Sequence, residues 1–177
     1  MLSNQINRMI MVCLLLAGLT GIVASSLVLA TPLGVPRDAK IESGNGVPKL
    51  CIPAEEINDV AVDSVSVSES FKRNGIRQVM WSVEINKIST PVVLNPGDCL
   101  EYGAALPGYK IINNSRPLEN GVTYYFRLNR RVSNSQRTSV TFYDAAFCPV
   151  LQGGELRYPQ YLYQKNGGVI RPRCDSD

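Results

Sequence analysis

Alternation of apolar and polar side chains restricts this chain to β-structure more than any other feature of its sequence. From Val79 to Ile85 every second residue is apolar, and the residues from Val122 to Leu128 repeat the pattern. A period of two places the apolar side chains on one face of an extended strand. No long segment after residue 30 has apolar residues at helical spacing. About seven strands, separated by turns rich in glycine, proline and asparagine, predict an all-β antiparallel sandwich.

Two strand features predict how the core is built. Trp81 is the only tryptophan, and it lies on the apolar face of its strand. We expect it in the core beside Val83, Tyr124 and Phe126. The segment 60–68 holds its valines in two successive phases, which predicts a bulge or a bend in that strand.

A short motif refines the predicted fold. The residues from Leu118 to Leu128 have the form L-x-x-G-x-x-Y-x-F-x-L. This form resembles the turn into the sixth strand of fibronectin-type and immunoglobulin-like domains, in which a leucine and a tyrosine brace the corner of the sandwich. The resemblance implies an immunoglobulin- or fibronectin-like sandwich and carries no information about function.

The N-terminal segment predicts export. Residues 9–30 carry no charge and are largely apolar, and Val28 and Ala30 have the small-residue spacing of a signal-peptidase site. We therefore expect a cleaved signal peptide over residues 1–30, followed by a flexible leader over 31–48, rich in proline and glycine, and one sandwich domain over 49–177. The alternative is that residues 1–30 stay uncleaved as a membrane anchor, which would be the only contact with a membrane.

The cysteine content agrees with export. Four cysteines follow the signal segment, namely Cys51, Cys99, Cys148 and Cys174. An even number in an exported domain predicts two disulfides, although the spacing leaves all three pairings open. The expected location is therefore the periplasm or the extracellular space.

Composition excludes several classes of function. The chain has no histidine, which removes the Ser-His-Asp and Cys-His nucleophile systems and the common zinc and copper ligand sets. It has 18 basic and 15 acidic residues; without Arg8 of the signal the difference is +2, too small to indicate a nucleic-acid partner. We predict a protein that is not an enzyme and needs no cofactor.

The candidate sites are few. Arg157, Tyr158, Tyr161 and Tyr163 lie close together in sequence, and arginine and tyrosine are enriched in protein interfaces, so we predict a partner-binding patch there. The acidic run of Glu55, Glu56 and Asp59 is interpreted as solvated surface. Asp144, which lies among aromatic residues, is either buried beside an arginine or directed outward.

The order of several short motifs resembles a known family. These are Lys49–Pro53, Pro96–Leu100, the Leu118–Tyr124 corner and Ala146–Cys148. In this order they are similar to a family of small enterobacterial periplasmic proteins, mostly lipoproteins, regarded as immunity proteins of type VI secretion systems. The resemblance implies an immunoglobulin-like sandwich that binds and neutralises an effector toxin. The chain departs from that family in lacking a lipidation cysteine at the end of its signal, and the extension from Cys148 to Cys174 has no counterpart.

Two other functions remain open. One is a structural surface protein, such as a fimbrial or adhesin-like subunit that donates a strand to a neighbour. The leader over 31–48 lacks the alternating apolar pattern of a donor strand, so this function ranks second. The other is a hydrolase that uses only carboxylates, which would require two acidic side chains converging in a pocket.

Overall fold

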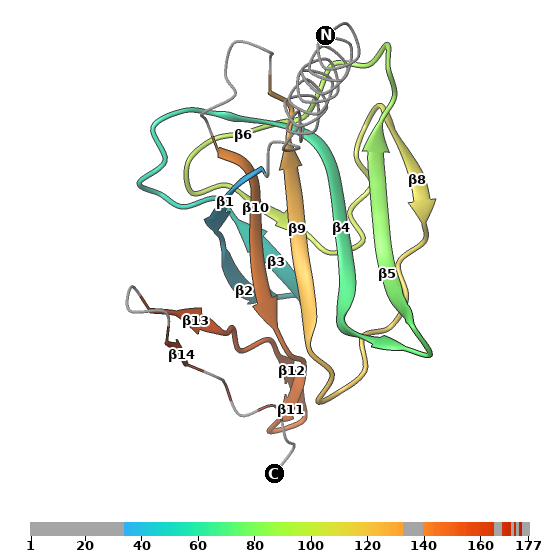
Figure 1. Cartoon of the computed structure of the whole chain (residues 1–177), viewed down its shortest axis with the longest axis vertical. Coiled ribbons are helices and arrows are strands. Elements are labelled where there is room, and N and C mark those ends of the chain that lie inside the picture. The colour runs from blue at the N-terminus through green and yellow to red at the C-terminus, as the bar shows by residue number, and fades with distance from the viewer. Residues whose placement is uncertain (1–33, 133–139, 165–167, 171, 173, 175–177) are drawn as a thin grey trace, which may run out of the picture. The chain divides into compact units, whose positions relative to one another are not determined.

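Every regular element in the described part of the molecule is a β-strand (Figure 1). The structure is a computed structural model that describes residues 34–132, 140–164, 168–170, 172 and 174, without the side chains of Arg73 and Tyr163. The predicted signal peptide lies outside these residues. Among them, no helix is long and apolar enough to span a membrane.

A large sheet forms one layer of the fold. Its order is β1-β10-β9-β4-β5-β8, with the two-residue β6 beside the start of β4. Neighbouring strands are antiparallel, except that β1 runs parallel to β10. The bounds are β1 (Val35–Asp38), β4 (Val60–Arg73), β5 (Ile76–Ile85), β6 (Val93–Leu94), β8 (Tyr109–Asn113), β9 (Tyr124–Arg130) and β10 (Val140–Phe147).

A small sheet and two separate hairpins complete the fold. The small sheet has the order β2-β3-β7, with β2 (Lys40–Gly44), β3 (Val47–Cys51) and β7 (Cys99–Glu101). The hairpins pair β11 (Val150–Gln152) with β12 (Glu155–Arg157), and β13 (Leu162–Tyr163) with β14 (Val169–Ile170). Buried side chains of the large and small sheets form one hydrophobic cluster. The predicted all-β fold is thereby confirmed; its immunoglobulin-like character stays a prediction.

Strand β4 contains the predicted bulge. Val62 pairs with Arg130 of β9, while Ser64 pairs with the preceding residue Asn129, so Asp63 is an extra residue on β4. One extra residue reverses which face each later side chain occupies. Consequently the valines on both sides of the bulge, Val60, Val62, Val65 and Val67, are all fully buried.

Trp81 lies at the centre of the core, as predicted. It is 2% exposed, and its ring packs edge-on against Tyr102 and Phe126, with centroid distances of 5.6 and 6.1 Å. Val83 and Tyr124 belong to the same buried cluster. Edge-to-face packing of this kind adds to the free energy gained by burying the rings.

The corner before β9 is braced as the motif predicts. The hydroxyl of Tyr124 accepts a hydrogen bond from the backbone N–H of Glu119 at 3.0 Å, and the Tyr124 ring is fully buried. Leu118 packs against the core beside it. Gly121 has a φ of 76°, a left-handed conformation that favours glycine at this turn.

The prediction of a flexible leader over residues 31–48 is wrong for the part that the structure describes. Residues 35–38 form β1 along β10, and residues 40–44 form β2 of the small sheet. Between them, the Ala39 N–H donates to the carbonyl oxygen of Asp144 at 2.8 Å. The segment lacks a long apolar pattern because it contributes only single buried side chains, Ala39, Ile41 and Pro48. The domain therefore begins well before Lys49.

The cysteines form the two disulfides that their number predicted. Cys51 pairs with Cys99 and joins β3 to β7, and Cys148 pairs with Cys174. The first bond links the facing strands of the small sheet. The second ties the end of the chain to the end of β10, so that the C-terminal segment is fastened to the large sheet. Two disulfides are typical of proteins in oxidising compartments.

Glu56 anchors β1 and is not solvated surface, contrary to the prediction for the acidic run. Its Oε2 accepts hydrogen bonds from the Tyr143 hydroxyl at 2.6 Å and from Arg37 of β1 at 2.8 Å. Its Oε1 accepts one from the Ile57 N–H at 3.1 Å, and its side chain is 7% exposed. Burial acts to raise the pKa of Glu56, but these hydrogen bonds and the Arg37 charge together hold that pKa below its ordinary value. Burial and the adjacent carboxylate raise the pKa of Tyr143.

The first prediction concerns the core. Replacing Trp81 by Ala removes the largest side chain from the centre of the sandwich and should lower the free energy of unfolding by about 3–5 kcal/mol. Urea denaturation followed by far-ultraviolet circular dichroism measures this loss. A loss below about 1 kcal/mol would contradict the packing described for this strand.

The second prediction concerns acid stability. Because the pKa of Glu56 is lowered on folding, its ionised form stabilises the fold above the ordinary glutamate pKa of about 4.3, and this stabilisation is lost as the pH falls through the lower folded value. Glu56→Gln should therefore cost about 1–2 kcal/mol at neutral pH and progressively less toward pH 2–3. The exposed neighbour supplies the control, since Glu55→Gln should change stability by less than about 0.5 kcal/mol. Equal pH dependence of the two variants in urea denaturation would refute this role for Glu56.

Candidate functional site

The tyrosine and arginine residues predicted to bind a partner do not form one exposed patch. Tyr158 is 5% exposed, its ring packs edge-on against Phe147 at 6.0 Å, and its hydroxyl donates a hydrogen bond to the carbonyl oxygen of Gly46. Burial also raises the pKa of Tyr158. Tyr158 is therefore a core residue, and its prediction as a contact residue is corrected.

The other three residues of that prediction lie in different environments. Tyr161 is partly buried, and its hydroxyl forms a hydrogen bond with Thr123 Oγ1 at 2.8 Å. Arg157 is exposed and pairs with Glu155 at 2.8 Å. Tyr163 belongs to β13, but its side chain lies outside the described residues. Only Arg157 is thus shown on open surface.

The segment 158–161 instead packs against β2 and the turn that follows it, and is hydrogen-bonded to both. The side-chain amide of Gln160 accepts from the Ile41 N–H at 2.7 Å and donates to the Ala39 carbonyl oxygen at 2.7 Å. These are the two hydrogen bonds that a neighbouring strand would offer to this part of the backbone. Together with the contact between Tyr158 and Gly46, they fasten the C-terminal segment to β2 and to the turn after it.

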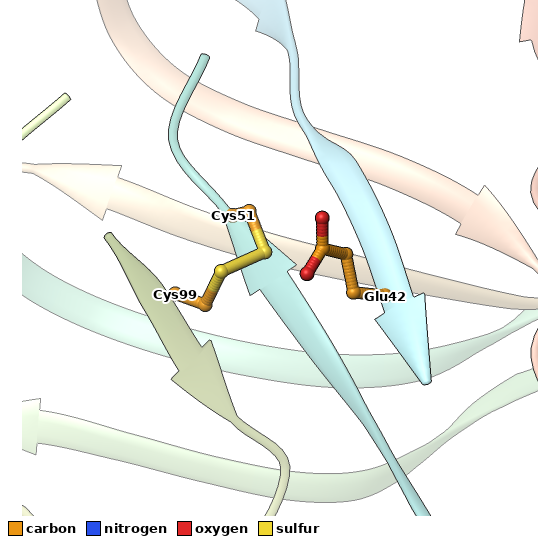
Figure 2. Close-up of side chains that lie close together, drawn as sticks. All are labelled: Glu42, Cys51 and Cys99. Atoms are coloured by element: carbon orange, nitrogen blue, oxygen red, sulfur yellow. A yellow bond between two sulfur atoms is a disulfide. The ribbon is translucent and has the colours of Figure 1, made fainter. Parts of the chain in front are cut away.

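Glu42, Cys51 and Cys99 lie close together and resemble a ligand group for a metal ion (Figure 2). Their potential ligand atoms lie within 4.8 Å of one another. However, Figure 2 shows the two sulfur atoms joined to each other. A disulfide offers no thiolate, and the thiolate is the form of cysteine that binds metal ions. With the disulfide formed, the Glu42 carboxylate is the one group of the three that can bind a metal ion.

The outer face of the large sheet has more of the features of a binding site than the Glu42 group. Here β10, β9, β4, β5 and β8 lie side by side (Figure 1), and in β4 and β9 the residues between the buried ones face away from the core. A shallow hollow of about 410 Å³ opens on this face. We call it the arginine–serine hollow; its lining residues are Ser66, Ser68, Arg77, Tyr125, Arg127 and Asp144.

Arg127 is held in place on the wall of the hollow. It donates to Asp144 Oδ2 at 2.6 Å, and its guanidinium lies 4.2 Å from the centroid of the Phe142 ring. The Asp144 side chain is 20% exposed. The sequence left open whether Asp144 is paired with an arginine or directed outward. Both hold, because Asp144 lies on the outer face and pairs with Arg127 of the adjacent strand.

Arg77 has a different set of contacts. Its guanidinium lies 5.7 Å from the centroid of the Tyr125 ring, and it donates a long hydrogen bond of 3.4 Å to the carbonyl oxygen of Ser70. In the described part of the chain, no carboxylate lies within salt-bridge distance of Arg77. Its charge is therefore open to a partner from outside the molecule.

The alternation of β4 supplies the serines of the hollow. Val65 and Val67 are buried, while Ser66 and Ser68, which follow them in the chain, face outward. Elsewhere on this face polar side chains pair across strands, for Asn129 donates to Ser64 Oγ at 2.9 Å and Asn113 donates to Ser82 Oγ at 2.7 Å. Where the structure describes side chains, the hydroxyls of Ser66, Ser68 and Tyr125 have no such partner. The hollow therefore presents unused hydrogen-bond donors.

This arrangement can bind a ligand, and its lining holds neither a pair of carboxylates nor a serine beside a histidine. Asp144 is the only carboxylate among the lining residues, and it is already paired with Arg127. A serine nucleophile needs an adjacent base, and the chain has no histidine. The alternation of β9 predicts that Tyr125 and Arg127 face away from the core. The contact of Arg77 with Tyr125 depends on strand order, which the sequence pattern does not give.

Comparisons with known proteins gave no guide to this site. No protein-family model, curated protein or solved structure matches the chain.

The third prediction follows from the placement of Tyr158. Tyr158→Ala should lower the free energy of unfolding by about 3 kcal/mol or more, because it leaves a cavity beside Phe147. Tyr158→Phe keeps the ring and loses one hydrogen bond, so the expected loss is about 1 kcal/mol. The exposed neighbour is the control, and Arg157→Ala should change stability by less than about 0.5 kcal/mol. Unchanged stability of Tyr158→Ala in urea denaturation would restore Tyr158 as a surface contact.

Proposed function

We propose that this protein is an exported, non-catalytic binding protein that neutralises a secretion-system toxin by covering it, with the outer face of the large sheet as the contact surface. The observation that carries the proposal is the arginine–serine hollow, where Arg77 has no carboxylate within salt-bridge distance and the three hydroxyls have no hydrogen-bond partner in the described chain. Unpaired directional donors on a rigid sheet favour specific recognition of another surface. The resemblance of the sequence to secretion immunity proteins supplies the class of partner.

Rigidity supports this use of the sheet. The face is backed by a core in which the inward residues of β4 and β9 are fully buried, and Arg127 is held by both Asp144 and Phe142. A partner that binds here would lose little free energy in ordering the contact residues. The two disulfides suit a protein that works in an oxidising compartment.

The size of the face sets a requirement on the complex. With strands about 4.8 Å apart and a rise of about 3.3 Å per residue, the five strands of 5 to 14 residues present roughly 700 Å². A standard protein interface buries about 800 Å² on each partner. The contact would therefore cover nearly the whole face.

The alternative functions have less support. A strand-donating surface subunit needs a free terminal segment, whereas residues 35–38 already pair with β10 of their own chain. A carboxylate hydrolase needs two convergent acidic groups, and the hollow has one, which is held by an arginine.

The fourth prediction tests the contact surface. The full chain should protect cells from a toxin encoded beside its gene and form a complex of fixed stoichiometry with that toxin in size-exclusion chromatography. Ser66→Trp places a bulky neutral ring in the hollow and should weaken the complex at least about tenfold, or 1.4 kcal/mol.

The control for this experiment is Asn58→Trp, a similar change at an exposed position outside the hollow, which should leave affinity unchanged. Both variants should keep the melting temperature of the parent protein. Full affinity of Ser66→Trp would remove this face as the contact, and failure of the parent chain to bind or protect would count against the immunity function itself.

A further inference from the structure

The arginine–serine hollow is rich in groups that donate hydrogen bonds. Ser66, Ser68 and Tyr125 offer hydroxyls, and the two arginines offer guanidinium N–H groups. Guanidinium groups donate and cannot accept. The one strong acceptor of the lining, Asp144, already receives a hydrogen bond from Arg127 at 2.6 Å. The three hydroxyls can donate or accept, so a ligand with acceptor oxygens can bind them and the Arg77 guanidinium together.

The charge of the hollow favours an anion. Two guanidinium groups and one carboxylate line it, which leaves one positive charge uncompensated. That charge belongs to Arg77, because Arg127 is the cation paired with Asp144. Packing over Tyr125 at 5.7 Å keeps the Arg77 guanidinium against the wall of the hollow, and a cation held over a ring is partly preorganised.

We infer that the arginine–serine hollow binds a carboxylate of the partner protein, an aspartate or glutamate side chain, with Arg77 as its ion-pair partner. A carboxylate can also accept hydrogen bonds from the hydroxyls of Ser66, Ser68 and Tyr125. This inference rests on the proposed function, because it names the chemistry of the partner at the same site. A guanidinium–carboxylate pair can form two parallel hydrogen bonds, which adds orientation to the attraction.

A singly charged group suits the site better than a phosphate. The Asp144 carboxylate forms part of the wall, and it repels a second anion, the more strongly the higher its charge. One uncompensated cation balances the single charge of a carboxylate but not the charge of nearly −2 that a phosphate monoester carries at neutral pH. The hollow therefore favours an acidic protein side chain over a phosphorylated ligand.

The test uses short peptides as probes, so it does not require the partner to be known. Acetyl-Gly-Glu-Glu-Gly-amide is titrated into the ¹⁵N-labelled protein and compared with the Gln-Gln peptide and with a phosphoserine peptide. The Glu peptide should shift the Arg77 Nε–H signal and the backbone amides of Ser66 and Ser68, and the shifts should weaken as salt is added. The Gln peptide should leave these signals unchanged.

Matched variants separate specific binding from general attraction. Arg77→Gln should abolish the shifts at Ser66 and Ser68, whereas Lys110→Gln, which removes the same charge from the exposed strand β8, should preserve them. Absence of shifts with the Glu peptide, equal loss in both variants, or stronger binding of the phosphoserine peptide would each overturn the inference.

These outcomes are distinguishable from failure of the proposed function. If the Glu peptide binds at Arg77 but Ser66→Trp leaves the toxin complex intact, the carboxylate site stands and the toxin contact does not. If Ser66→Trp disrupts the toxin complex but Arg77→Gln changes neither that complex nor the peptide spectra, the face is the contact and the carboxylate inference is wrong.

Discussion

The structure depends above all on strand β4 and on the bulge within it. β4 has partners on both sides, β9 and β5, and it also pairs with β6 at its start. Its valines are buried and its serines face outward because Asp63 adds one residue and reverses the phase. Without that extra residue, either Val60 and Val62 or Val65 and Val67 would face solvent. The same alternation of β4 therefore supplies valines to the core and serines to the outer face.

The C-terminal segment stabilises the fold, although its tyrosine and arginine content predicted a binding surface. Tyrosine and arginine are enriched at protein interfaces, and tyrosine is also found in cores where its hydroxyl has a hydrogen-bond partner. Tyr158 belongs to the second kind, since its hydroxyl reaches the Gly46 carbonyl while its ring lies in the core. Gln160 and the disulfide from Cys148 to Cys174 hold the same segment. The described part of the segment from Cys148 to Cys174 therefore contributes to the fold itself.

The surface most suited to recognition is made from ordinary residues of regular strands. Serines, one tyrosine and two arginines become a site because the sheet brings them together and, in the described chain, leaves the hydroxyls without partners and Arg77 without a carboxylate. Comparison with known proteins gave no match, so physical complementarity is the main guide to a partner. A donor-rich, weakly cationic hollow on a sheet backed by a buried core is compatible with binding.

The sequence by itself determined the alternating strands β5 and β9, because a period of two is a local property of neighbouring residues. It placed Trp81 and Tyr124 in the core, the bulge in β4, and four cysteines in two disulfides. Only the tertiary structure decided which cysteines pair, that residues 35–44 join the sheets, and that Glu56 is bound by Arg37 and Tyr143. It also decided that Arg77 and Arg127 share one hollow. Alternation states which face a side chain occupies, whereas strand order and register decide its neighbours, and these follow from packing over the whole chain.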